Sequence, residues 1–280
     1  MADWTKRVPF GTTGLAVSRL GIGSSFVGDA AVVEEAVERG VNYLYWGSIR
    51  RPAFGRALRH LARRGREDLV VTVQSYSRVG ALMAPSVELA LRRAGLEYFD
   101  FLLLGKWDEP PRPAIVDAAL RLKEQGKVRH LMLSTHNRPS LQGHFQEFAA
   151  GRSAFDVFML RYNAVYRGAE RDVFPFLPDD PRPGIVAYTA TRWGHLLDPK
   201  KMPAGEAPLR ARDCYRFALS HPAVSLCLCG PSDRAQMREA LEALDAGPLT
   251  DEERERIEKI GDHVYATSSP QFGDRGDAAA

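Results

Sequence analysis

The sequence has few cysteines and no long apolar run. Its 280 residues include three cysteines, Cys214, Cys227 and Cys229. Their number is odd and no second pair exists, so neither a disulfide framework nor a zinc site is supported, and we expect buried thiols and no metal. No stretch approaches the ~20 apolar residues that span a bilayer. The segment MADWTKRVPFG lacks the apolar core of a signal peptide. We therefore expect a cytoplasmic protein that does not bind membranes.

The sequence also has little excess charge of either sign. It contains 38 Lys and Arg against 35 Asp and Glu, for a net charge of +3, and the basic residues are dispersed. A nucleic-acid-binding surface would concentrate them on one face. We therefore expect no nucleic-acid partner and a small molecule as the ligand.

Short apolar runs alternate with segments of helical periodicity. In the helical segments, apolar residues fall at intervals of three and four positions, for example over residues 29–40, 52–65 and 233–247. The apolar runs show little polar alternation, which is typical of parallel strands covered by helices. Eight strand–helix units in about 250 residues predict an α/β protein, a (β/α)8 TIM barrel. The eight runs are RLGIG, GVNYLY, DLVVTVQ, YFDFLLL, VRHLMLS, FDVFMLRY, GIVAYT and AVSLCLC.

A doubly wound open sheet is the alternative fold. It would carry a glycine-rich phosphate loop after its first strand, but GIGSSFVG has no third glycine at the required spacing. Before that strand, KRVPF and LAVSRL flank the turn GTTG, which predicts a β-hairpin that caps the barrel. We predict one barrel domain over residues 1–265. The polar segment 266–280 is expected to be a mobile tail.

The active site of a TIM barrel lies at the C-terminal ends of its strands. The residues that end the predicted strands are polar and rich in hydrogen-bond donors. Since Arg and Lys pair with anions and carbonyl oxygens, we expect an anionic or carbonyl-bearing ligand. The strand-end residues are Tyr45, Gln74, Gly105, Lys106, Ser134 to His136, Arg161, Tyr162, Thr189 to Arg192, and Cys229 to Ser232.

Several blocks between residues 6 and 262 resemble the aldo-keto reductases: VPFGTTGLAVSRLGIG, GVNYLYWGSIRRPAFGRAL, LKEQGKVRHLMLST and GPSDRAQMREALEAL. The resemblance implies a TIM barrel that reduces carbonyls with NADPH. In that family a Tyr donates the proton, a Lys and an Asp lower its pKa, and a His orients the substrate. None of the four is kept here. The Asp falls on Tyr45, the Tyr on Arg50, the Lys on Gln74, and the His on Gly105 or, with a bulged strand, on Lys106.

The resemblance also implies positions for NADP(H). Gly230 precedes the last barrel helix, whose N-terminus favours a phosphate. Two departures weaken the match, since Met159 and Ala240 stand where the family has Gln and Asn. Capping of the helix by Ser232 is the alternative to cofactor binding. The implied cofactor-binding residues are Ser134, Thr189, Arg192, Gly230, Ser232, Arg234, Gln236 and Glu239.

Three functions follow as hypotheses. The first is an NADP(H)-linked oxidoreductase acting on a carbonyl or imine, with Tyr45 as the acid. In it, Lys106 or Arg50 lowers the pKa of Tyr45, Gln74 polarises the carbonyl, and His136 lies near the mouth of the barrel.

The second hypothesis is a non-redox enzyme, such as a lyase, isomerase or cyclase, in which Arg50, Lys106 and Arg161 hold an anion. The third is an inactive pseudo-enzyme that binds a nucleotide or a partner protein. The replaced positions keep polar side chains, which favours a site that binds a polar ligand.

Overall fold

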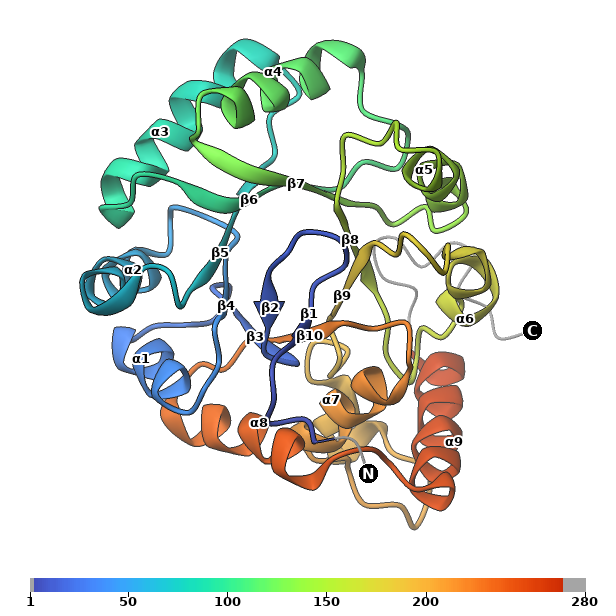
Figure 1. Cartoon of the computed structure of the whole chain (residues 1–280). Helices are drawn as coiled ribbons and strands as arrows, with labels where there is room; N and C mark the ends of the chain where they lie inside the picture. The colour runs from blue at the N-terminus through green and yellow to red at the C-terminus, as the bar shows by residue number, and fades with distance from the viewer. Residues whose placement is uncertain (1–2, 269–280) are drawn as a thin grey trace.

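Eight parallel strands close into a barrel (Figure 1). The computed structural model describes residues 3–268. Strand β10 pairs with both β3 and β9, so the sheet has no open edge, and the TIM barrel is confirmed over the open sheet. The barrel strands are β3 (Leu20–Gly23), β4 (Tyr43–Trp46), β5 (Val70–Ser75), β6 (Phe99–Leu104), β7 (Val128–Ser134), β8 (Val157–Arg161), β9 (Gly184–Tyr188) and β10 (Leu226–Cys229).

Helices surround the barrel and cover its outer face (Figure 1). Their ends follow ordinary capping chemistry: Pro52 starts α2 and Thr250 and Glu253 form a capping box at the start of α9. The helices are α1 (Ala30–Glu38), α2 (Pro52–Gly65), α3 (Met83–Ala94), α4 (Pro113–Glu124), α5 (Ser140–Ala149), α6 (Ala169–Asp172), α7 (Ala211–Ser220), α8 (Arg234–Ala246) and α9 (Asp251–Thr267). Short 3-10 turns are η1 (Gly80–Leu82), η2 (Phe174–Phe176), η3 (His195–Leu197) and η4 (Pro199–Lys201).

The predicted hairpin closes one end of the barrel. Strands β1 (Val8–Pro9) and β2 (Ala16–Val17) pair antiparallel. Phe10, which follows β1, is fully buried and packs edge-on against Tyr43 and Phe101 at centroid distances of 5.6 and 5.4 Å. A Cβ at Gly11 would lie 2.4 Å from the Gly184 nitrogen, so the turn requires glycine there. The hairpin cap is confirmed, and it leaves the opposite end of the barrel for a site.

Strand alternation divides the core into an inner and an outer part. In β4, Tyr43 and Tyr45 belong to the inner cluster within the barrel, whereas Leu44 and Trp46 belong to the outer cluster beneath the helices. The sequence predicted that the two tyrosines share one face, and this is confirmed.

The predicted domain boundary at residue 265 falls inside α9, which continues to Thr267. Residues 269–280, most of the predicted tail, lie outside the described residues, so the tail stays a prediction. Over residues 3–268, no helix has both the length and the apolar character needed to cross a membrane.

Candidate functional site

A cavity of about 430 Å³ opens at the C-terminal ends of the strands. Its size suits a small ligand. Loops after β3, β5, β6, β7, β9 and β10 contribute to it, together with the end of β4. The predicted site residues that line the cavity are Tyr45, Gln74, Lys106, Ser134, His136, Thr189 and Gly230.

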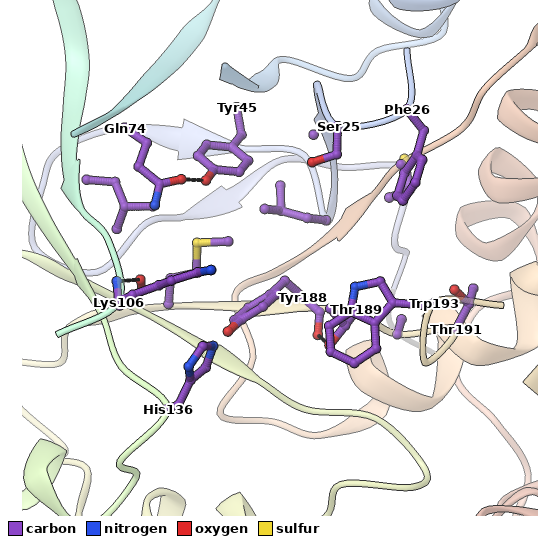
Figure 2. A pocket seen from close by; sticks show the side chains of 18 of the residues that line it. Ser25, Phe26, Tyr45, Gln74, Lys106, His136, Tyr188, Thr189, Thr191 and Trp193 are labelled. Atoms are coloured by element: carbon purple, nitrogen blue, oxygen red, sulfur yellow. Dashed lines mark hydrogen bonds between the residues drawn. The ribbon is translucent and has the colours of Figure 1, made fainter. Parts of the chain in front are cut away.

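Tyr45 and Gln74 form a hydrogen-bonded pair in the wall of this cavity. The Tyr45 hydroxyl donates to Gln74 Oε1 (Figure 2). The pair forms because both residues point inward from neighbouring strands, β4 and β5. We refer to these two side chains as the Tyr45–Gln74 pair.

The phenol of Tyr45 is held in its protonated form. Loss of solvent around the ring raises its pKa well above the ordinary value of 10.0, and the neighbouring phenols of Tyr76 and Tyr43 raise it further. The prediction that Lys106 or Arg50 lowers this pKa is therefore wrong. The physical reason is that desolvation dominates over charge at this position. Tyr45 is thus a hydrogen-bond donor at neutral pH rather than a base.

Two glycines make room for the Tyr45–Gln74 pair. A Cβ at Gly105 would lie 1.7 Å from Gln74 Nε2, and a Cβ at Gly47 would lie 2.9 Å from the Tyr45 hydroxyl. No side chain fits at position 105 while Gln74 keeps its place. Positions 74 and 105 are therefore sterically coupled, since a side chain at 105 requires Gln74 to move.

Lys106 extends from the loop after β6 into the cavity (Figure 2). Its backbone is left-handed, with φ of 58°. Arg78 donates to the carbonyl oxygens of Gly105 and Lys106 at 3.2 and 2.5 Å and stacks over Trp107 at 3.8 Å. On the other side, the backbone nitrogen of Lys106 donates to Ser134 Oγ at 3.0 Å. The loop is therefore clamped from both sides.

Backbone strain gathers at this end of the barrel. Within residues 3–268, the non-glycine residues with positive φ are Lys106, Thr189, Arg192 and Trp193, which follow β6 and β9. Such residues cost about 1–3 kcal/mol each and cluster where a fold positions functional groups. The strain supports the assignment of this cavity as the candidate site.

Aromatic side chains form the rim of the cavity, and sequence analysis missed most of them. Phe26, Tyr76 and Trp193 line it and are 57, 53 and 46% exposed. Tyr188 also lines it, and the inward alternation of β9 was a signal that would have found it. Phe26 and Tyr76 lie in loops just beyond strand ends, and no periodic pattern marks such positions.

Arg50, a predicted catalytic residue, does not line the cavity. It is exposed in the turn before α2, where its backbone nitrogen donates to Ser48 Oγ at 3.2 Å. Nearby, Trp46 Nε1 donates to the Arg51 carbonyl oxygen at 3.2 Å, which fixes this turn outside the barrel. The segment NYLYWGSIRR therefore sends its tyrosines inward and its arginines to solvent.

The predicted phosphate site at the start of α8 is occupied by the protein's own groups. Asp233 caps the helix by accepting from the Gln236 nitrogen at 2.9 Å. The Ser232 nitrogen donates to Gln236 Oε1 at 3.0 Å. The hydrogen bonds that Asp233 accepts, the strongest from the Gln236 backbone N–H, lower the pKa of its carboxyl group. An ionised carboxylate therefore lies at this helix end. A phosphate that approached this helix end would meet a like charge.

The other predicted cofactor residues of α8 also contact protein groups. Arg234 pairs with Glu35 of α1, and Arg238 pairs with the same carboxylate at 2.6 Å. Glu239 accepts from the Ala211 nitrogen at 3.0 Å and so caps α7. These side chains link α8 to α1 and α7 rather than facing the cavity.

Arg161 and Arg192 are buried beside the cavity and are not among its lining residues. Their guanidinium carbons lie 4.3 and 4.6 Å from the centroid of the Tyr166 ring, and both also face the Trp193 ring. They support the rim by stacking on these rings.

Metal ligands do not gather in the part of the chain that the structure describes. No group of three or more His, Cys, Asp or Glu residues there is placed to hold an ion. The three cysteines are free and buried, as predicted. Burial raises the pKa of the Cys229 thiol to about 12, so it is an inert thiol at neutral pH.

No protein-family model matches the sequence. Among solved structures, the chain is similar to the holo form of aldo-keto reductase AKR11C1 from Bacillus halodurans, with a TM-score of 0.75, 22% identity, and coverage of 91% of this chain and 96% of that one. The apo form of the same protein gives a TM-score of 0.69, 23% identity, and coverage of 91 and 95%. The chain thus has the aldo-keto reductase fold over nearly its whole length.

Proposed function

We propose that the protein is an oxidoreductase of the aldo-keto reductase type that acts on the carbonyl or imine of a small molecule, with Tyr45 as the proton donor. The observation that supports this proposal is the Tyr45–Gln74 pair in the wall of the cavity at the C-terminal end of the barrel. An O–H and an amide N–H there can address one substrate oxygen.

The pair supplies a proton and a second hydrogen bond to the substrate oxygen. The protonated Tyr45 hydroxyl turns from Gln74 Oε1 to the substrate oxygen and donates its proton as negative charge develops there. The amide nitrogen of Gln74 donates a second hydrogen bond to the same oxygen. Gly105 and Gly47 leave the space that the two side chains occupy, because a Cβ at either position would overlap them.

The cavity and the start of α8 differ in how they fit NADP(H). A nicotinamide cofactor, when bound, supplies the hydride. Ser134, Thr189 and Gly230 line the cavity and are the residues that would hold its reactive end. Asp233 and the Glu35–Arg234 pair do not fit the 2′-phosphate. We therefore expect NADH to bind at least as tightly as NADPH.

The test begins with titration of the protein with NADPH and NADH, followed by quenching of tryptophan emission. A panel of carbonyls and imines is then assayed by loss of absorbance at the nicotinamide band. Tyr45→Phe is expected to lower turnover by about 10²–10⁴-fold, the usual contribution of a positioned acid. Tyr98→Phe, a tyrosine stacked against Arg66 and Arg129 away from the cavity, is the matched control. Absence of binding of both nucleotides would sink the proposal.

A second candidate is a binding protein or non-redox enzyme in the same barrel. The acidic cap of α8 favours it, because an ionised carboxylate there does not assist the binding of a nucleotide phosphate. In that case a ligand would raise the melting temperature of the protein to the same extent with and without either nucleotide.

A further inference from the structure

We infer that the substrate carries a carboxylate as well as its carbonyl group, that Lys106 binds this carboxylate, and that the rest of the substrate is aromatic or otherwise apolar. The ligand class is thus an oxo acid. The inference rests on the proposed function for the carbonyl. Binding of the carboxylate needs no turnover and is tested separately.

The charges in the cavity wall favour an anion. Among the described residues that line it there is no Asp or Glu, so an entering carboxylate meets no like charge in the lining. Lys106 supplies an ammonium group, and Figure 2 shows its side chain running into the cavity below the Tyr45–Gln74 pair, with His136 nearby. An ammonium and a carboxylate form a charge-assisted hydrogen bond.

The backbone of the loop that carries Lys106 is held in one conformation, so the side chain leaves the loop from a fixed point. A left-handed backbone is unfavourable for lysine, yet Arg78 and Ser134 bond both sides of the loop. The Trp107 nitrogen adds a bond to the Ser134 carbonyl oxygen at 2.9 Å. Lys106 is exposed, and these contacts fix the backbone from which its side chain reaches the cavity.

The rim indicates the character of the rest of the ligand. Phe26, Tyr76 and Trp193 come from three separate loops and expose large ring surfaces at the mouth of one cavity. Exposed apolar surface gathered at a concave site marks a place where an apolar group binds. The Lys106 ammonium lies 6.0 Å from the centroid of the Tyr76 ring, so the cation and the aromatic wall face the same ligand.

The probes are two aromatic oxo acids, each with its neutral methyl ester: benzoylformate, and 4-phenyl-4-oxobutanoate to sample a longer separation of the two groups. Their affinities are measured by quenching of tryptophan emission, without nucleotide, at neutral pH. At least one acid is expected to bind about tenfold more tightly than its ester, as for a charged hydrogen bond in a half-open site.

Variants of Lys106 assign this preference to the side chain. Lys106→Met is expected to remove the tenfold preference and leave the affinity for the ester unchanged, which also shows that the variant is folded. Lys106→Arg is expected to keep the preference. Lys259→Met, which removes an exposed lysine of α9, is the matched control and is expected to behave as the parent protein.

Three results would overturn the inference: equal affinity for acid and ester in both pairs, a preference that survives in Lys106→Met, or no binding of either acid up to the order of 10 mM. Its failure is distinguishable from failure of the proposed function. If the protein binds the acids through Lys106 but shows no nicotinamide-linked turnover, the inference holds and the proposed reductase function fails. If acids and esters are turned over equally, the reductase function holds and the inference fails.

Discussion

The Tyr45–Gln74 pair and the start of α8 use similar polar side chains but hold them in different ways. Both side chains of the pair are half-buried, and a Cβ added at Gly105 or Gly47 would overlap them. At α8, the side chains of Arg234 and Arg238 are 55 and 60% exposed and share one carboxylate. Exposed ion pairs contribute little to stability and rearrange easily, whereas closely packed side chains resist rearrangement. Steric contact therefore limits the Tyr45–Gln74 pair on the side of the two glycines, whereas weak bonds hold the side chains at the start of α8.

The largest effect is expected from Gly105→Ala. The added Cβ would overlap the Gln74 amide, the end of a flexible side chain that borders the cavity, so we expect Gln74 to move at a cost of about 1 kcal/mol of stability, as for a strained rotamer, and turnover to fall at least a hundredfold. Denaturant unfolding and the carbonyl assay measure the two.

Two further variants show whether this effect comes from the contact itself. Gly143→Ala in α5, where a Cβ would meet nothing within 4 Å, is expected to be neutral or stabilising. Gln74→Ala is expected to restore the stability of Gly105→Ala in the double variant, though not its activity. Additive losses in the double variant would contradict the steric coupling.

The second largest effect is a loss of stability at alkaline pH, to which Tyr45 in the cavity wall contributes. The pKa of Tyr45 is raised in the folded protein, so the unfolded chain releases its proton first. Stability from this group is present below the ordinary value of 10.0 and falls as the pH rises above it, by up to about 1.4 kcal/mol per pH unit. Tyr45→Phe should reduce the fall of unfolding free energy with pH, measured by denaturant unfolding between about pH 9 and 11. An unchanged slope would mean that the phenol is solvated.

The start of α8 responds at the opposite end of the pH scale. The pKa of Asp233 is lowered in the folded protein from 3.8, so its contribution is present above that value and is lost as the pH falls through the folded pKa. Asp233→Ala is expected to remove the contribution without affecting the alkaline limb, which unfolding curves at both ends of the scale would show.

A smaller effect is expected for nucleotide choice. Asp233→Ser keeps a good capping side chain and removes the negative charge that faces a phosphate. We expect the affinity for NADPH to rise about threefold relative to NADH, as for a charge near a helix end. Fluorescence titration of both nucleotides measures the ratio. A fall in this ratio would mean that the acidic cap assists binding of the 2′-phosphate.

The smallest effect is expected from Arg234→Ala. Arg234 shares Glu35 with Arg238, and both arginines are exposed. Because Arg238 stays in place, the midpoint of thermal unfolding should not change measurably. A clear drop would show that the link between α1 and α8 is more rigid than exposed ion pairs usually are.

Local pattern was sufficient to predict the barrel, the hairpin and the inward tyrosines of β4. Each depends on the spacing of apolar residues along one short segment, which the chain carries wherever it folds. The strand-end rule likewise found Tyr45, Gln74, Lys106 and His136 in one cavity, because parallel strands end on the same side.

Other features depend on distances between segments far apart in the chain. The exclusion of Arg50 from the cavity, the raised pKa of Tyr45 and the contact of Gln74 with Gly105 all arise from the arrangement of neighbouring strands and loops. The pairing of Arg234 with Glu35 arises from the packing of α8 on α1. Sequence periodicity carries no information on such contacts, since burial and charge at a site are set by residues that only folding brings together.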